Sequence, residues 1–361
     1  MIELKLSEIA AAVSGELVGA DLLITGSVET DSRLVSAGSL FVAKPGEVTD
    51  GHLFLGSALA SGALGAIVEI AQPVAMSQIV VSNSVVALGE LAKYVIGKLH
   101  AAGRLKVIAV TGSNGKTSTK NMLRSILEKF GNTVAPIESY NNEVGAPISM
   151  LKASYETDYL VAELGADGIG SIRYLSEMCV PDVAVELKVG LAHVGEFGGI
   201  ETTFEIKSEL VKALHPKAEV ILNADDSLVA QMADLTSARK TWFGTNNDAA
   251  VRASNIGVTL EGTRFHLTIE NQEFGTVTLN ILGEHQVMNA LASLSVAKVL
   301  GLDIRSALAS LEGMNLAERW RMQLLKGPNG SVVINDAYNA SPESMRADRK
   351  SVVKGKSVFA C

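Results

Sequence analysis

The sequence predicts an α/β protein built around a doubly wound, mostly parallel sheet. Short apolar runs at 105–110, 159–163, 183–187 and 220–223 are of the kind that parallel strands bury on both faces. Segments with helical periodicity separate these runs, which is the order of elements that a parallel sheet needs. A glycine-containing turn also joins the first run to a helix, as in the strand–loop–helix units of such sheets.

A smaller α/β unit is predicted ahead of this sheet, over residues 1–95. Residues 62–69 have the pattern of a helix end followed by a strand, and residues 78–81 form another apolar strand. The segment 97–104 contains two glycines, which predicts a linker between the two units.

The most specific pattern of the chain lies between Val110 and Lys120, which reads Val-Thr-Gly-Ser-Asn-Gly-Lys-Thr-Ser-Thr-Lys. Backbone N–H groups in such a turn converge on anionic oxygens, and the helix dipole adds to them. We expect Lys116 to reach the β- and γ-phosphates of a nucleotide and the Thr117 hydroxyl to bind its magnesium ion. The strand before and the helix after argue against a chance match in a surface loop. The predicted nucleotide-binding residues are Gly112, Ser113, Asn114, Gly115, Lys116, Thr117 and Ser118.

The remaining elements follow from periodicity. Apolar residues at helical spacing predict a helix over 116–130, with Gly131 as its C′ cap. Residues 251–282 alternate β-rich segments with turns, which predicts an antiparallel addition to the sheet. Residues 285–300 form an alanine- and leucine-rich helix that ends at Gly301.

Composition excludes several classes of protein. The 361 residues, 47% hydrophobic and 19% charged, are typical of a soluble globular chain of two or three domains. No apolar run reaches the roughly 18 residues that a membrane span needs. A net charge of −8 without a long basic block argues against nucleic acid as a partner. Two cysteines cannot form a disulfide framework and the N-terminus lacks a secretory pattern, so we expect a cytoplasmic protein.

Three polar residues lie at or after the ends of predicted strands, where open α/β sheets bind ligands. Glu163 closes the run 159–163 and is a candidate magnesium ligand. His193 follows the next run, and Lys207 lies in a helix after a Gly-Gly break. By position alone, such a histidine is more often structural and such a lysine more often exposed.

The loop has the short form Thr-Gly-x-Asn-Gly-Lys-Thr, because Val110 stands where the usual phosphate loop has a glycine. In this form it resembles the ATP-dependent amide ligases of the Mur ligase and folylpolyglutamate synthetase superfamily. Further segments, up to about residue 347, resemble Mur ligases in the same order. The resemblance implies three domains: 1–95 binding a UDP-linked precursor, 96–312 binding ATP, and 313–347 beginning a Rossmann-like third domain.

The resemblance at the metal site rests on Glu163-Leu-Gly-Ala-Asp, on Ala-His193-x-x-x-Phe-Gly and on Ile-Lys207-x-Glu. It implies that Glu163 and Thr117 bind one magnesium ion and that His193 binds a second. It also implies that Lys207 is carbamylated, which turns a cation into a carboxylate that serves the metal site. Lys116, His193 and Lys207 are the catalytic residues that the resemblance implies.

Later segments resemble the family's nucleotide-binding and amine-binding regions. Residues 282–292 resemble Gly-x-His-Asn-x-x-Asn-Ala-Leu-Ala, and residues 335–345 carry the Tyr-Asn-Ala signature associated with a dipeptide substrate. The residues implied are His285, Asn289, Arg321 and Asp336 for the nucleotide, and Tyr338 and Asn339 for the dipeptide.

The segments 31–33 and 38–54 resemble the UDP-binding domain of the family, and 141–147 resembles the region over which the peptidyl precursor lies. An arginine fork in the first segment matches phosphate oxygens. The substrate-binding residues implied are Ser32, Arg33, Asp50, His52, Asn141 and Asn142.

The implied activity joins D-alanyl-D-alanine to UDP-N-acetylmuramoyl-tripeptide through an acyl phosphate, in peptidoglycan synthesis, by a monomer that uses ATP and Mg²⁺. Two alternatives stay open: a sibling ligase that adds the third peptide residue, and a nucleotide-binding remnant without ligase activity. The resemblance stops after residue 347, and the basic segment 348–361 lacks helical periodicity. We expect this segment to be an aberrant tail, most of the third domain to be absent, and ligation to be impaired.

Overall fold

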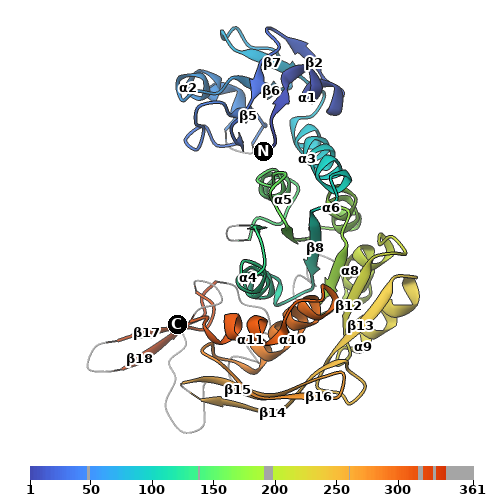
Figure 1. The fold of residues 1–361 in the computed structure, drawn as a ribbon. Coiled ribbons are helices and arrows are strands. Elements are labelled where there is room, and N and C mark those ends of the chain that lie inside the picture. Colours follow the sequence, from blue (N-terminus) through green and yellow to red (C-terminus); the bar gives the residue numbers. More distant parts are fainter. Residues whose placement is uncertain are drawn as a thin grey trace.

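The described residues form a larger and a smaller sheet, joined by a long helix, together with a short two-stranded pair and a separate hairpin (Figure 1). The larger sheet is mostly parallel, so the predicted fold class is confirmed. The computed structural model describes residues 1–46, 49–136, 139–190, 198–259, 261–315, 320–327 and 331–338.

The smaller sheet lies in the N-terminal part of the chain. Its strand order is β2-β7-β6-β5-β4, with β4 to β7 parallel and β2 antiparallel at the edge, while β1 and β3 pair separately. The predicted strands within 62–69 and 78–81 correspond to β6 and β7. The elements are β1 (Leu4–Lys5), α1 (Leu6–Ala12), β2 (Glu16–Val18), β3 (Leu23–Ile24), β4 (Val28–Glu29), β5 (Leu40–Val42), η1 (Gly51–Phe54), α2 (Leu55–Ala60), β6 (Gly65–Val68) and β7 (Ser77–Val80).

A single helix, α3 (Ser84–Ala101), connects the two sheets (Figure 1). Asn83 caps its start, because the side-chain oxygen accepts hydrogen bonds from the amides of Val85 and Val86 at 3.0 and 2.9 Å. Its apolar face joins the core of the central unit. The Asn83 cap therefore stabilises the first turn of α3, and burial of the apolar face stabilises the rest of the helix.

The linker predicted at 97–104 is wrong, because α3 continues to Ala101. Leu99 is only 2% exposed, and its burial outweighs the low helix propensity of Gly97. The chain leaves the helix at Gly103, whose φ is +83°. The predicted domain division between residues 95 and 96 falls inside this helix and stays a prediction.

The larger sheet has the strand order β16-β15-β14-β13-β12-β11-β8-β10-β9. Neighbouring strands from β9 to β14 are parallel. All four apolar runs predicted as strands are observed, and β8 lies between β10 and β11. The bounds are β8 (Lys106–Thr111), β9 (Thr133–Val134), β10 (Tyr159–Glu163), β11 (Val183–Glu186), β12 (Glu219–Asn223) and β13 (Arg239–Gly244).

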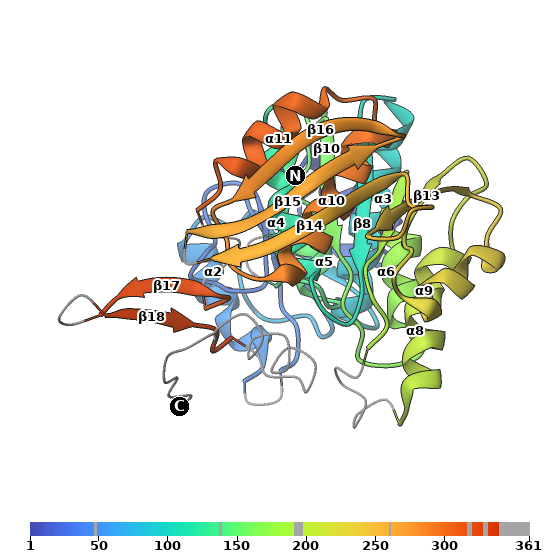
Figure 2. The ribbon, with the colours of Figure 1, turned by 90° about the horizontal axis from the view of Figure 1, so that it is seen from below.

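Antiparallel strands extend this sheet at one edge, as predicted for 251–282. Figure 2 shows them side by side, with β15 between β14 and β16. They are β14 (Val251–Thr259), β15 (Gly262–Ile269) and β16 (Gln272–Leu279).

Helices cover both faces of the parallel strands, as in a doubly wound sheet. The helices α5, α6 and α8 share one core with α3, and α4, α10 and α11 share the other (Figure 1). The predicted helix over 285–300 is α10. The bounds are α4 (Lys116–Leu127), α5 (Gly145–Met150), α6 (Ser171–Cys179), α8 (Ile200–Lys212), α9 (Ser227–Gln231), η2 (Met232–Leu235), α10 (Glu284–Val299) and α11 (Ile304–Glu312).

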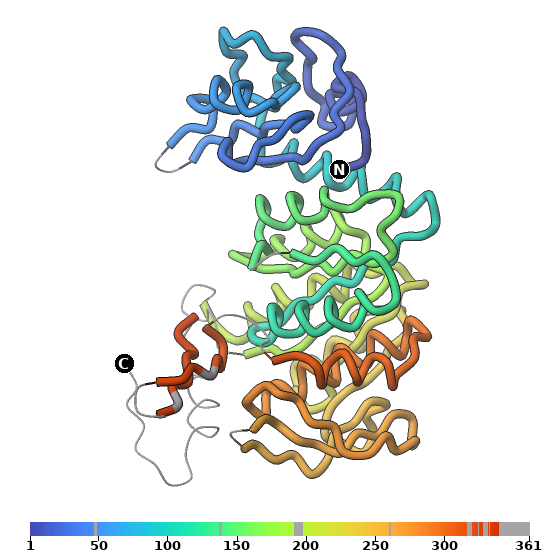
Figure 3. Tube along the Cα trace, turned by 60° about the vertical axis from the view of Figure 1, so that its left-hand side comes forward, coloured from blue at the N-terminus to red at the C-terminus, as the bar shows by residue number. Residues whose placement is uncertain are grey.

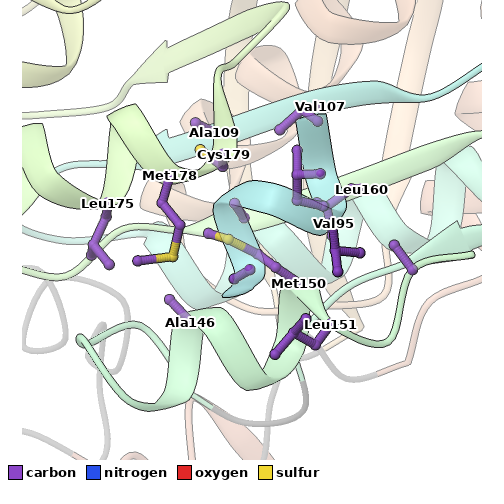
Figure 4. Packing of buried hydrophobic residues seen from close by; sticks show 14 of the residues in the cluster. Val95, Val107, Ala109, Ala146, Met150, Leu151, Leu160, Leu175, Met178 and Cys179 are labelled. Carbon is purple, nitrogen blue, oxygen red and sulfur yellow. The ribbon is translucent and has the colours of Figure 1, made fainter. Parts of the chain in front are cut away.

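The first of these cores is packed by side chains from helices and strands together. Figure 4 shows Val95, Val107, Leu160, Met178 and Cys179 gathered in it, and each is at most 2% exposed. Burying one such apolar side chain stabilises the fold by about 1.5–3 kcal/mol. Burial also raises the pKa of the Cys179 thiol to about 12, which is typical of a structural cysteine.

The helix after the loop ends earlier than predicted. α4 ends at Leu127, whose carbonyl oxygen accepts the Gly131 amide at 3.0 Å. Gly131 does not have a positive φ, so the prediction of a left-handed C′ cap is wrong. A Cβ atom there would lie 2.6 Å from Oδ2 of Asp158. Glycine is needed for this close approach, which joins residues distant in sequence.

The strands β17 (Gln323–Lys326) and β18 (Val332–Asn335) pair antiparallel and extend away from the central sheet (Figures 1 and 3). Whether they begin a third domain over 313–347 stays a prediction, and the segment 348–361 lies outside the described residues. Across the described ranges, no helix combines the length and apolar character needed to cross a membrane.

A substitution at Phe265 tests the core that α4, α10 and α11 share. This residue is fully buried on β15, so Phe265→Ala should lower the free energy of unfolding by about 3–5 kcal/mol, measured by urea denaturation. Phe274→Ala on β16 is the matched control, because that ring is only part-buried, 5.9 Å from the Arg305 guanidinium. Equal losses in the two variants would contradict this placement of the core.

Candidate active site

The loop between β8 and α4 is shaped by two glycines. Gly112 and Gly115 have φ of +146° and +90°, which L side chains rarely adopt. A Cβ atom at Gly115 would lie 2.5 Å from Oδ1 of Asn289 in α10. Glycine is therefore required at 115 by both the backbone and the approach of α10.

Ser113 ties this loop to the chain that follows β11. Its amide donates to the carbonyl oxygen of Lys188 at 2.8 Å. Its hydroxyl accepts from the Gly190 amide at 2.9 Å and lies 3.2 Å from the carbonyl oxygen of the same residue. Asn114 is half-buried at the bend, and Ser118 is buried in the first turn of α4.

Lys116, the first residue of α4, is half-buried and folds back over the loop. Its Nζ donates to the carbonyl oxygen of Gly112 at 2.8 Å. Desolvation lowers the pKa of Lys116 and Arg321 lowers it further, whereas Glu163 and Glu186 raise it. The ammonium group therefore lies within electrostatic range of two carboxylates at the carboxyl edge of the sheet.

Glu163, the last residue of β10, is buried beside the loop. Its Oε1 accepts hydrogen bonds from the Thr117 hydroxyl at 3.1 Å and from the Asn141 side-chain amide at 2.8 Å. Its Oε2 is buried and has no hydrogen-bond partner among the described residues. Such an oxygen favours an approaching cation, and Mg²⁺ prefers carboxylate and hydroxyl oxygens. Thr117 and Glu163 can therefore hold a divalent cation.

Glu186 is a second buried glutamate at this edge, and no sequence motif singles it out. It is the last residue of β11 and fully buried, and neither carboxylate oxygen has a hydrogen-bond partner within the described ranges. Burial raises the pKa of Glu186 to about 8, while Lys207 and Lys116 oppose the rise. The signal that could have found it is a carboxylate closing an apolar run, as at Glu163.

Lys207 on α8 is 4% exposed. The pKa of Lys207 is lowered to about 7, first by burial and then by Lys116, although Glu186 and Glu209 act to raise it. Glu209 itself is fixed by two backbone amides at the start of α6, at 2.5 and 3.0 Å. The structure thus brings Lys207 into electrostatic range of Lys116 and Glu186.

Two predicted site residues, His193 and Asn339, lie outside the described residues. In the part of the chain that the structure describes, no group of three His, Cys, Asp or Glu side chains is arranged to hold a metal ion by itself. Of the cation-site residues predicted from the sequence, Thr117, Glu163 and Lys207 are therefore the ones that the structure describes.

The first turns of α10 face the loop. The Asn289 side chain accepts from the Thr119 hydroxyl at 3.3 Å and donates to Oε1 of Gln286 at 3.0 Å. Gln286 Nε2 lies 3.1 Å from Nε2 of His285. His285 is exposed, and desolvation by the surrounding protein lowers the pKa of its ring, with a further lowering by Arg321. Asn289 thus lies at the loop, and His285 is linked to it through Gln286.

Residues of the hairpin segment also approach the loop. The Tyr338 hydroxyl donates to Oγ of Ser139 at 2.7 Å, and this Oγ is 3.2 Å from the Thr117 hydroxyl. The Arg321 guanidinium lies 4.2 Å from the centroid of the Tyr338 ring, a cation–π distance. Asp336 accepts a backbone amide of the hairpin at 3.0 Å. Tyr338 and Arg321 therefore lie together beside Ser139, and Asp336 is bonded within the hairpin segment.

Asn141 and Asn142 precede α5 and behave differently. Asn141 turns toward Glu163, and its carbonyl oxygen accepts the Gly165 amide at 2.8 Å. The Asn142 side-chain oxygen accepts the Gly145 amide at 2.8 Å, which supports the start of α5. Asn141 therefore lies at the loop edge, Asn142 supports the start of α5, and their part in binding the precursor stays a prediction.

The residues predicted to bind the UDP-linked precursor lie in the smaller unit, beyond α3 (Figure 1). Arg33 is exposed and pairs with Asp31, at 2.5 Å between Nη2 and Oδ2. The Arg33 guanidinium lowers the pKa of Asp31 to about 2. Ser32 lies half-buried between them.

Asp50 and His52 make local contacts. Oδ1 of Asp50 accepts the His52 amide at 2.9 Å and lies 2.6 Å from Nδ1 of the ring. Nε2 of His52 accepts the Glu69 amide at 3.0 Å. Both ring nitrogens are therefore engaged within the fold, with Nδ1 as the donor to Asp50. The role of this pair in binding substrate stays a prediction.

Comparison with known proteins gives consistent matches. The family model described as Mur ligase middle domain matches residues 110–297, and the Mur ligase family catalytic domain matches residues 25–97. The UDP-N-acetylmuramoyl-tripeptide–D-alanyl-D-alanine ligase of Mycobacterium tuberculosis (strain ATCC 25618 / H37Rv) is 40% identical over 96% of this chain and 73% of its own length.

Solved structures agree with these matches. A crystal structure of MurF from Acinetobacter baumannii has a TM-score of 0.89 at 32% identity, covering 97% of this chain and 76% of that chain. The MurF ligase from Thermotoga maritima in complex with ADP has a TM-score of 0.80 at 29% identity, covering 91% of this chain and 75% of that one. The chain thus spans about three quarters of the length of these proteins.

The loop geometry can be tested at Gly115. We expect Gly115→Ala to weaken ADP binding at least about tenfold, because a methyl group is disfavoured at this φ and would clash with Asn289. Isothermal titration calorimetry measures the change. Gly168→Ala is the control, since a Cβ atom there meets no atom within 4 Å. Wild-type affinity in Gly115→Ala would contradict the assignment of the loop.

Proposed function

This chain belongs to the Mur ligase family, and we propose that it joins D-alanyl-D-alanine to UDP-N-acetylmuramoyl-tripeptide using ATP. The names of its relatives describe this reaction, which belongs to peptidoglycan synthesis. One observation in the structure carries the proposal. Lys116, Thr117 and Glu163 meet at the carboxyl edge of the parallel sheet, and Glu163 presents a buried oxygen without a partner there.

The chemistry has two steps. A substrate carboxylate oxygen forms a bond to the γ-phosphorus of ATP while the bond to ADP breaks, which gives an acyl phosphate. The dipeptide amine then attacks the acyl carbon, loses a proton, and phosphate leaves. Lys116 would stabilise the charge that develops on the transferring phosphoryl group, and such stabilisation dominates catalysis of this kind. The Nζ atom of Lys116 already lies within the loop, where it donates a hydrogen bond to the carbonyl oxygen of Gly112.

The residues at the loop edge fit a divalent cation. Thr117 and Glu163 would hold it, and Lys207 and His193 would serve a second site. A bound cation neutralises the negative charge of the phosphates. Burial lowers the pKa of Lys207 to about 7, so a large fraction of its amine is neutral near neutral pH. A neutral amine can attack CO₂, forming an N–C bond and releasing a proton, and this supports the proposed carbamylation.

The other predicted residues are assigned to three further contacts. The proximity of the hairpin and α10 to Thr117 supports the nucleotide assignments. In this proposal His285, Asn289, Arg321 and Asp336 contact the nucleotide, Tyr338 and Asn339 the dipeptide, and Ser32, Arg33, Asp50, His52, Asn141 and Asn142 the UDP-linked precursor.

Location and assembly are part of the same proposal. A cytoplasmic monomer with a UDP-precursor unit at 1–95 and an ATP unit at 96–312 suits these substrates, and the unpaired, buried Cys179 suits a reducing compartment. The sibling ligase has less support, because the relative at 40% identity carries the dipeptide-ligase name. A nucleotide-binding remnant would bind ADP without forming ligated product.

Lys116→Ala tests the phosphoryl-transfer role. Loss of the ammonium group should lower kcat by a factor of about 100 or more, measured as phosphate release with both substrates present. Lys129→Ala, an exposed lysine just beyond the same helix, should leave the rate unchanged. Wild-type turnover by Lys116→Ala would refute the assignment.

Lys207→Ala tests carbamylation. The variant should lose activity that bicarbonate cannot restore, whereas short carboxylates such as acetate should restore part of it by replacing the missing carboxylate. Lys212→Ala, an exposed lysine on the same helix, is the control. Full activity of Lys207→Ala without any addition would exclude this role.

A further inference from the structure

Glu186 occupies a defined place beside the phosphate loop. β8 lies between β10 and β11, and the register pairs Glu163 with Val110 and Glu186 with Thr111. The loop begins directly after Thr111. A glutamate therefore ends each strand that flanks the loop strand, and the two are offset by one residue of β8.

The side chains of Glu163 and Glu186 lie on opposite faces of the sheet. Alternate residues of a strand share a face, and Ala184 of β11 packs in the same core as Ile206 and Leu210 of α8. The Glu186 side chain therefore points toward the face that α8 covers. Lys207 lies on that helix and is an electrostatic neighbour of Glu186.

Glu186 differs from the other buried glutamates in the hydrogen bonds that its carboxylate accepts. Glu163, Glu186 and Glu209 are the buried acidic residues of the described ranges. Glu209 accepts two backbone amides, and Glu163 accepts a hydroxyl and an amide. Neither oxygen of Glu186 has a hydrogen-bond partner among the described residues. A fully buried carboxylate without donors destabilises a fold unless a cation compensates it.

We propose that Glu186 supplies an anionic oxygen to a divalent cation bound between the phosphate loop and α8, next to Lys207. The inference rests on the proposed nucleotide site. Hard divalent cations prefer carboxylate oxygens, and Glu186 offers two without competing donors. A carbamate on Lys207 would add a second negative group here, and a cation between the two groups would remove their repulsion. With Glu186 included, the residues proposed to bind cations come from both strands that flank β8.

The test is cation binding to the full chain. Mn²⁺ is titrated with and without ADP, and free Mn²⁺ is followed by electron paramagnetic resonance. Glu186→Gln should weaken Mn²⁺ binding about 10- to 100-fold. Glu186→Asp should weaken it similarly, because the charge stays but the oxygen is withdrawn. Glu219→Gln is the matched control, since Glu219 begins β12 at the opposite end of the sheet and pairs with Arg239 at 3.1 Å.

Thermal unfolding in EDTA separates this role from a purely structural one. Glu186→Gln should change Tm by less than about 2 °C, because the near-isosteric amide breaks no hydrogen bond that the described residues make with Glu186. The proposal is overturned if Glu186→Gln lowers this Tm by more than about 2 °C, which would show a structural role, or if either Glu186 variant binds Mn²⁺ as tightly as the wild type. Failure of the proposed nucleotide site would be seen separately, as absence of ADP binding by the wild type.

Discussion

Burial of opposite charges around the phosphate loop is the constraint on which this architecture depends. Glu163 and Glu186 end the strands beside β8, and Lys116 lies within electrostatic reach of both. Buried charges are tolerated only when opposite charges or ligands compensate them. The strand ends, the start of α4 and the face of α8 must therefore keep one arrangement. The bonds of Ser113 and the left-handed Gly115 hold the loop in it.

The rest of the fold maintains this edge from a distance. Apolar cores on both faces of the sheet keep the strands in register, so that the polar strand ends converge. The long helix α3 carries the smaller unit, with Arg33 and His52, away from the loop. The hairpin segment brings Tyr338 back to the loop through Ser139. Precursor contacts and phosphate chemistry are thus placed on separate parts of the molecule.

Sequence patterns predicted the elements whose signal is local. The run 159–163 has apolar side chains on both faces of an extended chain, which is a local pattern, so the strand could be recognised directly. The glycines were harder to interpret. Gly97 looked like a linker but is helical, because Leu99 is buried, and Gly131 looked like a cap but makes room for Asp158. A glycine in a sequence does not tell which distant neighbour requires it.

The sequence by itself determined the strand–loop–helix unit, the order of the parallel strands along the chain, and the residue types that serve phosphate and a divalent cation. Only the tertiary structure decided which carboxylates are satisfied. Among the described residues, Glu209 accepts two backbone amides, Glu163 keeps one oxygen without a hydrogen-bond partner, and both oxygens of buried Glu186 lack one. Hydrogen-bond satisfaction depends on donors from other strands and helices. Their approach is set by packing over the whole sheet, which no local pattern contains.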